Sequence, residues 1–534
     1  MALALAVLIL AALLIPLAQH WRAARDYPFQ LDAEEGFILN QALTLARGGS
    51  LYTPITRPPF LVGNYTPLFP WVYSWLTGTR ATPRSLPLGR ALVQLAALGA
   101  ALALAGIVLA RRRRVLSALL APLLFLSAYE VFHWGAFVRV DLPALFFTVA
   151  GLGAFLLIRP RWGMVAAAVL FVLAAATRQT AILAPLACAL ALALHDRKRL
   201  AWFLIPYAGL GLLGFAWLEW RTGGEFTRHV VVYNQNRLDW SGWRMLMHHE
   251  IWFWYHWLIG ALALTAALWV LERARGRRRV NVAPGGSDLR ELPHTRHALA
   301  IYALLAALSL LSYAKIGAAP NYALEPLLGA ILWGMDALGR LLGELRIVDC
   351  GLRNEDERGV RSAERGNECG EKDGSGVGWR MRLGILVVAL LVLAHAATLG
   401  EKALRFSWSP TPTADDRATG REVWLAARGA PGDIFCEEPI FSLLAGKSVL
   451  EQPFIMAQLA REGQWDDAPF CRLLAQRRFS LVIVNDDLAA GAVRGDYERY
   501  TPGMARALRA AYVPDGQITL PGLRKTYFLW RPRP

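Results

Sequence analysis

Long apolar runs separated by short polar segments make up most of the sequence. A helix that crosses the hydrocarbon core of a bilayer needs about 20 mainly apolar residues, and fewer when flanking residues snorkel to the interface. By this measure the pattern predicts about eleven membrane-spanning helices. They are Ala2–Leu17, Pro87–Ala110, Val115–Ser127, Leu142–Ile158, Gly163–Ala176, Thr180–Leu194, Leu200–Leu218, Ile251–Leu271, Ala298–Ser312, Tyr322–Leu342 and Leu383–Leu399.

Basic clusters between these runs predict the direction in which the chain crosses the membrane. When the N-terminus is placed in the cytoplasm, Arg111–Arg114, Arg159 with Arg161, Arg197–Arg199 and Arg273–Arg279 all fall on the cytoplasmic side. This alternation is what the positive-inside rule requires. The first run lacks a basic region and a small-residue cleavage site, so we expect a retained helix rather than a signal peptide.

Two segments depart from the apolar pattern. Residues 343–382 are rich in Gly, Glu and Arg, which predicts a disordered cytoplasmic linker between a transmembrane domain at 1–342 and the last spanning helix at 383–400. Residues 401–534 then follow on the outer side as a small α/β domain. Its expected strands are Asp433–Cys436, Phe479–Val484 and Tyr527–Trp530, and Ile440–Ala445 is an expected helix. The fold class is therefore a polytopic α-helical membrane protein with a C-terminal extracytoplasmic α/β domain.

Composition supports a membrane protein and argues against a nucleic-acid-binding protein and against a metal centre built from Cys and His. Hydrophobic residues make up 55% of the chain and charged residues 18%. The net charge of +16 resides in the short clusters between spans, so it does not indicate a nucleic-acid partner. No Cys or His spacing predicts a metal centre, and the adjacent His248 and His249 point in different directions on a helix. A divalent ion held by carboxylates and histidines stays open.

The five cysteines are too few for a disulfide scaffold. Cys436 and Cys471 share the oxidising side of this topology, which leaves two alternatives, a disulfide or two free thiols.

The densest polar cluster outside the spans lies in the first outer loop, residues 19–86. Asp32, Glu34 and Glu35 precede an amphipathic segment that contains Phe37, Leu39, Leu43 and Leu45, and the aromatic stretch Phe69–Trp75 follows Pro67. Amphipathic, aromatic helices lie in the plane of the membrane interface, where they would hold the acids at headgroup depth. The alternative is a set of solvated acids in the first turn of a helix.

This loop resembles the first outer loop of the GT-C fold, in particular that of bacterial relatives of protein mannosyltransferases and aminoarabinose transferases. Matching motifs follow in order: Arg139-Val140-Asp141-Leu142-Pro143, Thr177-Arg178-Gln179-Thr180 and Asn321-Tyr322-Ala323-Leu324-Glu325-Pro326. The acidic motif is Glu34-Glu35 with Asp32 nearby, where the family usually has an Asp-Glu pair. The resemblance implies an inverting transfer of a sugar from a polyprenyl phosphate to an envelope lipid, glycan or protein, at the outer face of the bacterial cytoplasmic membrane.

The resemblance also implies roles for individual residues. Glu34 is the first choice for the general base, with Asp32, Glu35 and Asp141 as further acids; Asp141 alternatively pairs with Arg139. The donor phosphate would face cations, for which the outer-side candidates are Arg178, Arg139, Lys315 and Arg244. Candidate substrate-binding residues are Tyr322, Glu325 and Asn234. At each position a purely structural role is the alternative: an acid can stabilise the start of a helix, and an arginine can anchor a helix at the membrane edge.

Two other functions fit a polytopic membrane protein. A transporter or lipid flippase usually has ionisable residues near the bilayer midplane, whereas the spans here are largely free of charge and the polar residues collect at one interface. A scaffold would not need about eleven spans. The pattern therefore favours catalysis at the outer interface, with the sugar and the acceptor undetermined.

Overall fold

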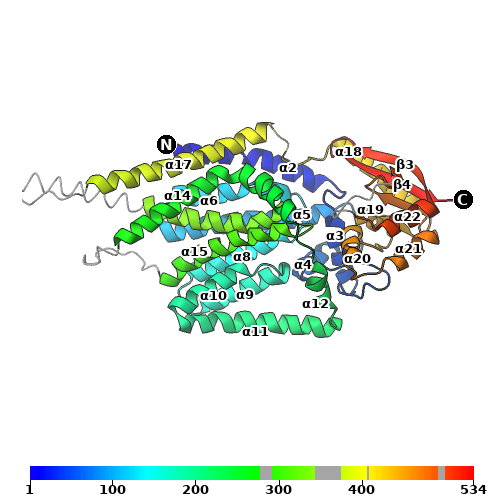
Figure 1. Cartoon of the computed structure of the whole chain (residues 1–534), viewed down its shortest axis with the longest axis horizontal. Helices are drawn as coiled ribbons and strands as arrows, with labels where there is room; N and C mark the ends of the chain where they lie inside the picture. The colour runs from blue at the N-terminus through cyan, green and yellow to red at the C-terminus, as the bar shows by residue number, and fades with distance from the viewer. Residues whose placement is uncertain (277–291, 343–374, 406–407, 491–498) are drawn as a thin grey trace, which may run out of the picture.

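A bundle of helices and a smaller α/β unit make up the molecule (Figure 1). The computed structural model describes residues 1–276, 292–342, 375–405, 408–490 and 499–534. The N-terminus lies toward one end of the long axis and the C-terminus at the other, in the α/β unit.

Each apolar run that the pattern identified is helical. The bundle contains α1 (Ala2–Ala12), α2 (Leu14–Asp26), α5 (Ser85–Arg112), α6 (Val115–Leu126), α8 (Asp141–Leu157), α9 (Trp162–Thr177), α10 (Leu183–His195), α11 (Arg197–Thr222), α14 (Phe253–Gly276), α15 (Pro293–Leu308), a helix at 324–342 and α17 (Ser375–Arg405). Within the described residues, six helical stretches are long and apolar enough to cross a membrane, and four apolar helices are shorter. This indicates a multi-pass membrane protein, and the total of about eleven spans stays a prediction.

Several helices begin or end at other residues than the predicted spans, and two of them differ at their starts as follows. The helix expected from Thr180 begins at Leu183, because residues 179–182 form a turn after α9. The helix α17 that contains the predicted span 383–400 begins earlier, at Ser375, and no proline interrupts residues 375–382. The rest of the predicted linker, 343–374, lies outside the described residues.

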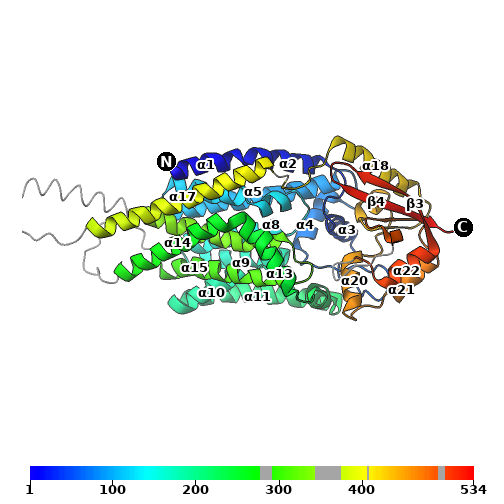
Figure 2. The same cartoon turned by 45° about the horizontal axis from the view of Figure 1, so that its top comes forward.

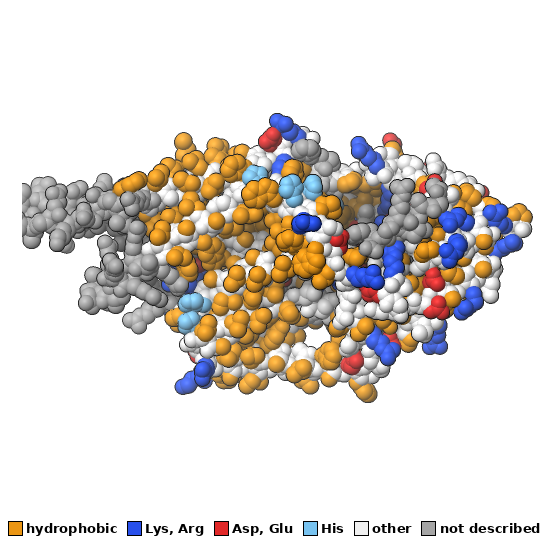
Figure 3. Space-filling view, in the orientation of Figure 1, with side chains coloured by type: hydrophobic (Ala, Val, Ile, Leu, Met, Phe, Trp, Pro, Cys, Tyr) orange, Lys and Arg blue, Asp and Glu red, His pale blue; other side chains and the backbone are white. Residues whose placement is uncertain are grey.

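The surface of the bundle suits a hydrocarbon environment. Hydrophobic side chains cover the face of the bundle seen in Figure 3, whereas Lys, Arg, Asp and Glu gather over the α/β unit. Only Phe203 of α11 is buried, and Ile205, Leu213 and Trp220 of the same helix are highly exposed. An apolar surface of this extent marks contact with lipid.

Charged residues gather at the two ends of the bundle. At one end, Arg111 and Arg112 form ion pairs with Asp336 over 2.8 and 2.5 Å. At the other end, short helices lie between the bundle and the α/β unit (Figures 1 and 2). These are α3 (Glu35–Ala46), α4 (Leu68–Thr77) and α12 (Glu225–Val230). Further short helices among the described residues are α7 (Tyr129–Trp134), η1 (Val232–Asn234), α13 (Trp240–Leu246), η2 (Met247–Trp252), η3 (Ser309–Ala314) and η4 (Pro320–Ala323).

The α/β unit is built on a four-stranded sheet of order β1-β2-β4-β3, in which β1 and β2 are parallel and the other pairs are antiparallel. Strands β1 (Ile434–Cys436), β2 (Leu481–Val484) and β4 (Lys525–Pro532) lie where the sequence predicted strands, and β3 (Tyr512–Leu520) is an addition. The helices are α18 (Ala414–Gly429), α19 (Pro439–Leu444), α20 (Pro453–Arg461), α21 (Ala468–Ala475), η6 (Leu488–Ala490) and α22 (Pro502–Ala511).

Cys436 and Cys471 are free thiols, so the structure takes the second of the two alternatives. Side chains of a strand alternate between the two faces of the sheet. Cys436 packs with Ile434 in the core that is continuous with the bundle, whereas Cys471 packs against the core that contains Phe435. The two sulfur atoms therefore lie on opposite faces.

The first outer loop is built into the α/β unit. The backbone N–H of Phe60 donates to the carbonyl of Leu450 (2.8 Å), and the N–H of Gln452 donates to the carbonyl of Phe60 (3.1 Å). The indole N–H of Trp465 donates to the carbonyl of Ile55 (3.0 Å). Ile55 and Phe60 share one hydrophobic core with the α/β unit. The loop and the unit therefore pack as one body.

Replacement of Phe60 by Ala should loosen this attachment. The side chain is fully buried against Trp465 and Phe470, and a Phe→Ala change in a core costs about 3–5 kcal/mol. We expect faster proteolytic release of the C-terminal unit from the purified protein, measured by timed digestion. Trp71→Ala, at an exposed position, is the control and should digest like the unaltered protein. Equal rates for both variants would contradict the docking.

Candidate functional site

Arg90 of α5 holds the segment that carries Asp32, Glu34 and Glu35 in place. Its guanidinium is completely buried and donates to the backbone carbonyls of Ala24, Tyr27 and Phe29 over 2.5–2.7 Å. It also forms two hydrogen bonds with the Glu35 carboxylate, over 2.8 and 2.7 Å. A bidentate pair of this kind fixes both partners in one geometry.

Glu35 is fully occupied by these contacts. Besides the two bonds from Arg90, its carboxylate accepts the backbone N–H groups of Leu31 (2.7 Å) and Val138 (2.8 Å). Gly36 beside it has no room for a Cβ, which would lie 2.2 Å from Oε1 of Gln30. The second acid of the Glu34-Glu35 pair is therefore turned into the core and not toward the other candidate acids.

The remaining candidate acids meet two arginines, and together they form what we call the acid–arginine cluster: Asp32, Glu34, Arg139, Asp141 and Arg178. Arg139 Nη1 lies 3.2 Å from Asp32 Oδ1, and Arg178 Nη1 lies 2.8 Å from Asp141 Oδ1. Asn321 donates to Asp141 over 2.8 Å. Three loops that are distant in sequence are thus brought to one place at the end of the bundle.

Arg139 retains unused hydrogen-bonding capacity. Its Nε and Nη1 are buried and form no hydrogen bond with any described residue, although Nη1 is within ion-pair distance of Asp32. A buried donor without an acceptor is costly, so a site of this kind is suited to an anionic ligand. Arg139 is the cation of the cluster that is best placed to receive one.

Glu34 lies beside Arg139 and is held from the opposite side by the α/β unit. The amide of Gln452 donates to both carboxylate oxygens over 3.4–3.5 Å, and the Asp32 carboxylate accepts the backbone N–H of Glu34 (3.1 Å). Burial raises the pKa of the Glu34 carboxyl above its ordinary value, and Arg139 opposes part of this rise. Glu34 thereby combines a carboxylate with an environment that makes it a stronger base.

Lys315, Tyr322 and Glu325 surround Arg178. The guanidinium lies 5.6 Å from the centre of the Tyr322 ring, and Glu325 is within electrostatic reach. Burial, and then the charge of Arg178, lower the pKa of the Lys315 ammonium. All three predicted residues are therefore near the cluster.

Two predicted residues are placed elsewhere. Asn234 donates to the backbone carbonyls of Asn64, His229 and Val230, which makes it a clamp for the loop that carries Tyr65. Arg244 is exposed on α13, and within the part of the chain that the structure describes it has no contact with the acid–arginine cluster. Among the described residues, no group of three His, Cys, Asp or Glu side chains is arranged to hold a metal ion.

Four residues of the site are absent from the sequence-based set: Arg90, Tyr65, Gln179 and Gln452. Tyr65 lies among Glu34, Arg139, Asp141 and Arg178, and burial raises the pKa of its hydroxyl. An arginine within an apolar run was a signal that could have identified Arg90, because buried charges in membranes are rare without a partner. No local signal identifies Gln452.

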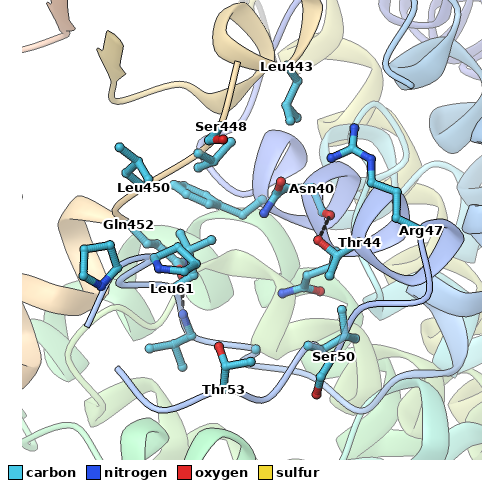
Figure 4. Close-up of a pocket in the computed structure, with 18 of the residues that line it drawn as sticks. Asn40, Thr44, Arg47, Ser50, Thr53, Leu61, Leu443, Ser448, Leu450 and Gln452 are labelled. Atoms are coloured by element: carbon cyan, nitrogen blue, oxygen red, sulfur yellow. Dashed lines mark hydrogen bonds between the residues drawn. The ribbon is translucent and has the colours of Figure 1, made fainter. Parts of the chain in front are cut away.

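Two hollows reach neighbours of the acid–arginine cluster. A groove of about 1070 Å³ is lined mainly by apolar side chains of α9, α11 and the start of α4, and it reaches Thr66 and Gln179, the neighbours of Tyr65 and Arg178. A second cavity, of about 700 Å³, is more polar and includes Gln452, the partner of Glu34 (Figure 4). Each hollow therefore reaches a neighbour of the cluster, and the two hollows share Ser50 and Leu51 in their walls.

Glu35→Gln should destabilise the fold, because it leaves the Arg90 charge buried without compensation. Breaking a buried ion pair from one side costs about 3–5 kcal/mol. Glu401→Gln is the matched control, since its i,i+4 pair with Arg405 is more than half exposed and such pairs contribute about 0–1 kcal/mol. Thermal unfolding in detergent compares the two, and an equally small effect of both changes would contradict the organising role of Glu35.

The fold is that of known membrane glycosyltransferases of the GT-C type. ArnT from Cupriavidus metallidurans bound to undecaprenyl phosphate aligns with a TM-score of 0.52 and 15% sequence identity, over 98% of this chain and 97% of that chain. The archaeal oligosaccharyltransferase AglB from Archaeoglobus fulgidus, in complex with an inhibitory peptide and a dolichol-phosphate, aligns with a TM-score of 0.51 and 13% identity, over 99% of this chain and 73% of that chain. No protein-family model and no curated protein matches the sequence.

Proposed function

We propose that this chain, which has the GT-C fold, is an inverting glycosyltransferase that moves a sugar from a polyprenyl phosphate to a hydroxyl group of a cell-envelope acceptor. The observation that carries the proposal is Arg139 beside the acid Glu34: its buried Nε forms no hydrogen bond with a described residue, and its Nη1 has only the ion pair with Asp32. The two structural neighbours, captured with undecaprenyl phosphate and with a dolichol-phosphate, support a donor of this class.

The donor would use the apolar groove for its lipid and the arginines for its phosphate. A polyprenyl chain can lie between α9 and α11, where the groove is open and apolar. Its phosphate would then reach Arg139 and Arg178, which can bind phosphate oxygens in a bidentate manner, with Lys315 nearby as a point charge. These cations stabilise the negative charge that develops on the leaving phosphate, and such stabilisation is often the largest catalytic contribution.

Glu34 acts as the general base in this mechanism. The acceptor oxygen attacks the anomeric carbon as the bond from that carbon to the phosphate oxygen breaks, the proton passes to Glu34, and the polyprenyl phosphate leaves. A single displacement of this kind inverts the anomeric centre. Asp32 and Asp141 orient Arg139 and Arg178, and Gln452 orients the base.

The topology would place this reaction at the outer face of a bacterial cytoplasmic membrane. Arg111 and Arg112 lie at one end of the bundle with Asp336, whereas the acid–arginine cluster lies at the other end beside the α/β unit. Basic residues favour the cytoplasmic side, so the α/β unit would lie outside.

Glu34→Gln should abolish most transfer without unfolding the protein. Loss of a general base lowers a rate by roughly 10²–10⁴-fold. In cells that lack the gene, we expect a polyprenyl-phosphate sugar to accumulate and an envelope glycan to be lost, both measured by mass spectrometry. The unaltered gene and the control Arg244→Ala should restore the glycan, and Glu34→Gln should not. Full restoration by Glu34→Gln at equal membrane abundance would refute the role of this residue.

The pH dependence of transfer should report Glu34. The base acts as a carboxylate, so the rate falls as the pH drops through its pKa, and burial moves that pKa above the range of an ordinary glutamate. Arg139→Met removes a charge that opposes the rise, and it should shift the acid limb of the profile to higher pH in addition to slowing transfer. The profile of kcat against pH for the purified enzyme measures both effects, and an unchanged acid limb in Arg139→Met would contradict the assignment.

A further inference from the structure

The polar cavity next to Glu34 joins three parts of the chain that are far apart in sequence. Figure 4 shows Asn40 and Thr44 of α3, with Arg47 at the C-cap of that helix, facing the cavity from one side and Ser448 and Gln452 of the α/β unit facing it from the other. Positions 40, 44 and 47 are four and three residues apart, so they form one face of α3. The segment 50–63 completes the wall. The cavity exists only because the α/β unit is docked on the first outer loop.

The charge of this lining is positive and is not balanced locally. Arg47, Arg57 and Lys447 contribute to the wall, and no Asp or Glu does. Arg57 is exposed and forms no ion pair with a described residue. Arg47 donates to the carbonyl of Thr79, and Lys447 donates to those of Ala430 and Gly432. These acceptors are neutral, so they do not compensate the positive charge of either side chain. A concave surface that is lined by positive charges attracts anions.

The neutral lining suits a hydroxyl-rich ligand. Amide and hydroxyl side chains, which can both donate and accept hydrogen bonds, come from Asn40, Gln41, Thr44 and Ser448. The Oε1 of Gln41 is buried and has no hydrogen-bond partner among the described residues. Phe37 and Leu450 add apolar patches against which the C–H face of a sugar can pack. The volume of about 700 Å³ is in the range of small-molecule sites.

We infer that this cavity binds the acceptor of the transfer reaction and that the acceptor is an anionic saccharide, a glycan that carries carboxylate or phosphate groups. The inference rests on the proposed function and adds the class of the second substrate. The groove that reaches Thr66 and Gln179 is apolar and suits the lipid donor, which leaves the polar cavity for the acceptor. Gln452 lines the cavity and donates to Glu34, so an acceptor hydroxyl at this wall lies next to the base.

Binding to the full-length protein in phosphatidylcholine nanodiscs tests this by isothermal titration calorimetry. The probes are trigalacturonic acid, the uncharged trisaccharide maltotriose, mannose 6-phosphate and inorganic phosphate. The double variant Arg47→Gln/Arg57→Gln removes two charges from the cavity and retains polar side chains. Arg80→Gln/Arg84→Gln removes the same charge from exposed positions outside the lining and is the matched control.

We expect trigalacturonic acid to bind more tightly than maltotriose, mannose 6-phosphate to bind more tightly than phosphate, and the cavity variant to weaken both charged sugars about tenfold. The control variant should bind them as the unaltered protein does. The inference is overturned if the cavity variant retains full affinity, if maltotriose binds equally well, or if inorganic phosphate matches mannose 6-phosphate, since the site would then recognise no anionic saccharide.

Glu34→Gln separates this inference from the proposed function. It should bind trigalacturonic acid normally, because Glu34 does not line the cavity, while it fails to restore the envelope glycan. Charge-selective binding together with full restoration by Glu34→Gln would refute the proposed mechanism and leave the cavity assignment in place. Loss of restoration without charge-selective binding would refute the cavity assignment alone.

Discussion

The buried ion pair between Arg90 and Glu35 is the constraint on which the rest of the site depends. Arg90 is fixed by α5, and through Glu35 and three backbone carbonyls it fixes the chain from Ala24 to the start of α3. A buried pair of charges contributes little net stability, but it admits one geometry, because any shift leaves a charge unpaired in a medium of low polarity. The position of Asp32 and Glu34 follows from it.

Two hollows of different character reach neighbours of the acid–arginine cluster. The apolar groove is lined by α9 and α11, whereas the polar cavity is formed by the first outer loop and the α/β unit. In the proposed mechanism, a substrate with a lipid tail and a substrate rich in hydroxyl groups would therefore reach the same carboxylate from different hollows. The arginines of the cluster would stabilise the negative charge of a phosphate, as water does in solution.

The α/β unit belongs to the site and is not an appended domain. It shares a hydrophobic core with the first outer loop, supplies the amide that holds Glu34 and provides one wall of the cavity. Coupling of this kind makes the geometry of the base depend on contacts made by residues near position 450, more than 400 positions along the chain.

The sequence by itself determined the helices of the bundle, because a backbone in hydrocarbon must satisfy its hydrogen bonds within each segment, and an apolar run of sufficient length has few other solutions. It also indicated that acids and arginines collect at the end where the cluster lies. Only the tertiary structure decided which acid is available. Glu34 and Glu35 are adjacent in sequence, and successive side chains at the start of a helix point about 100° apart. Arg90 therefore pairs with Glu35 and leaves Glu34 to the cluster. The sequence could not reveal Gln452 or the free state of Cys436 and Cys471, because each depends on side chains brought together by the docking of distant segments.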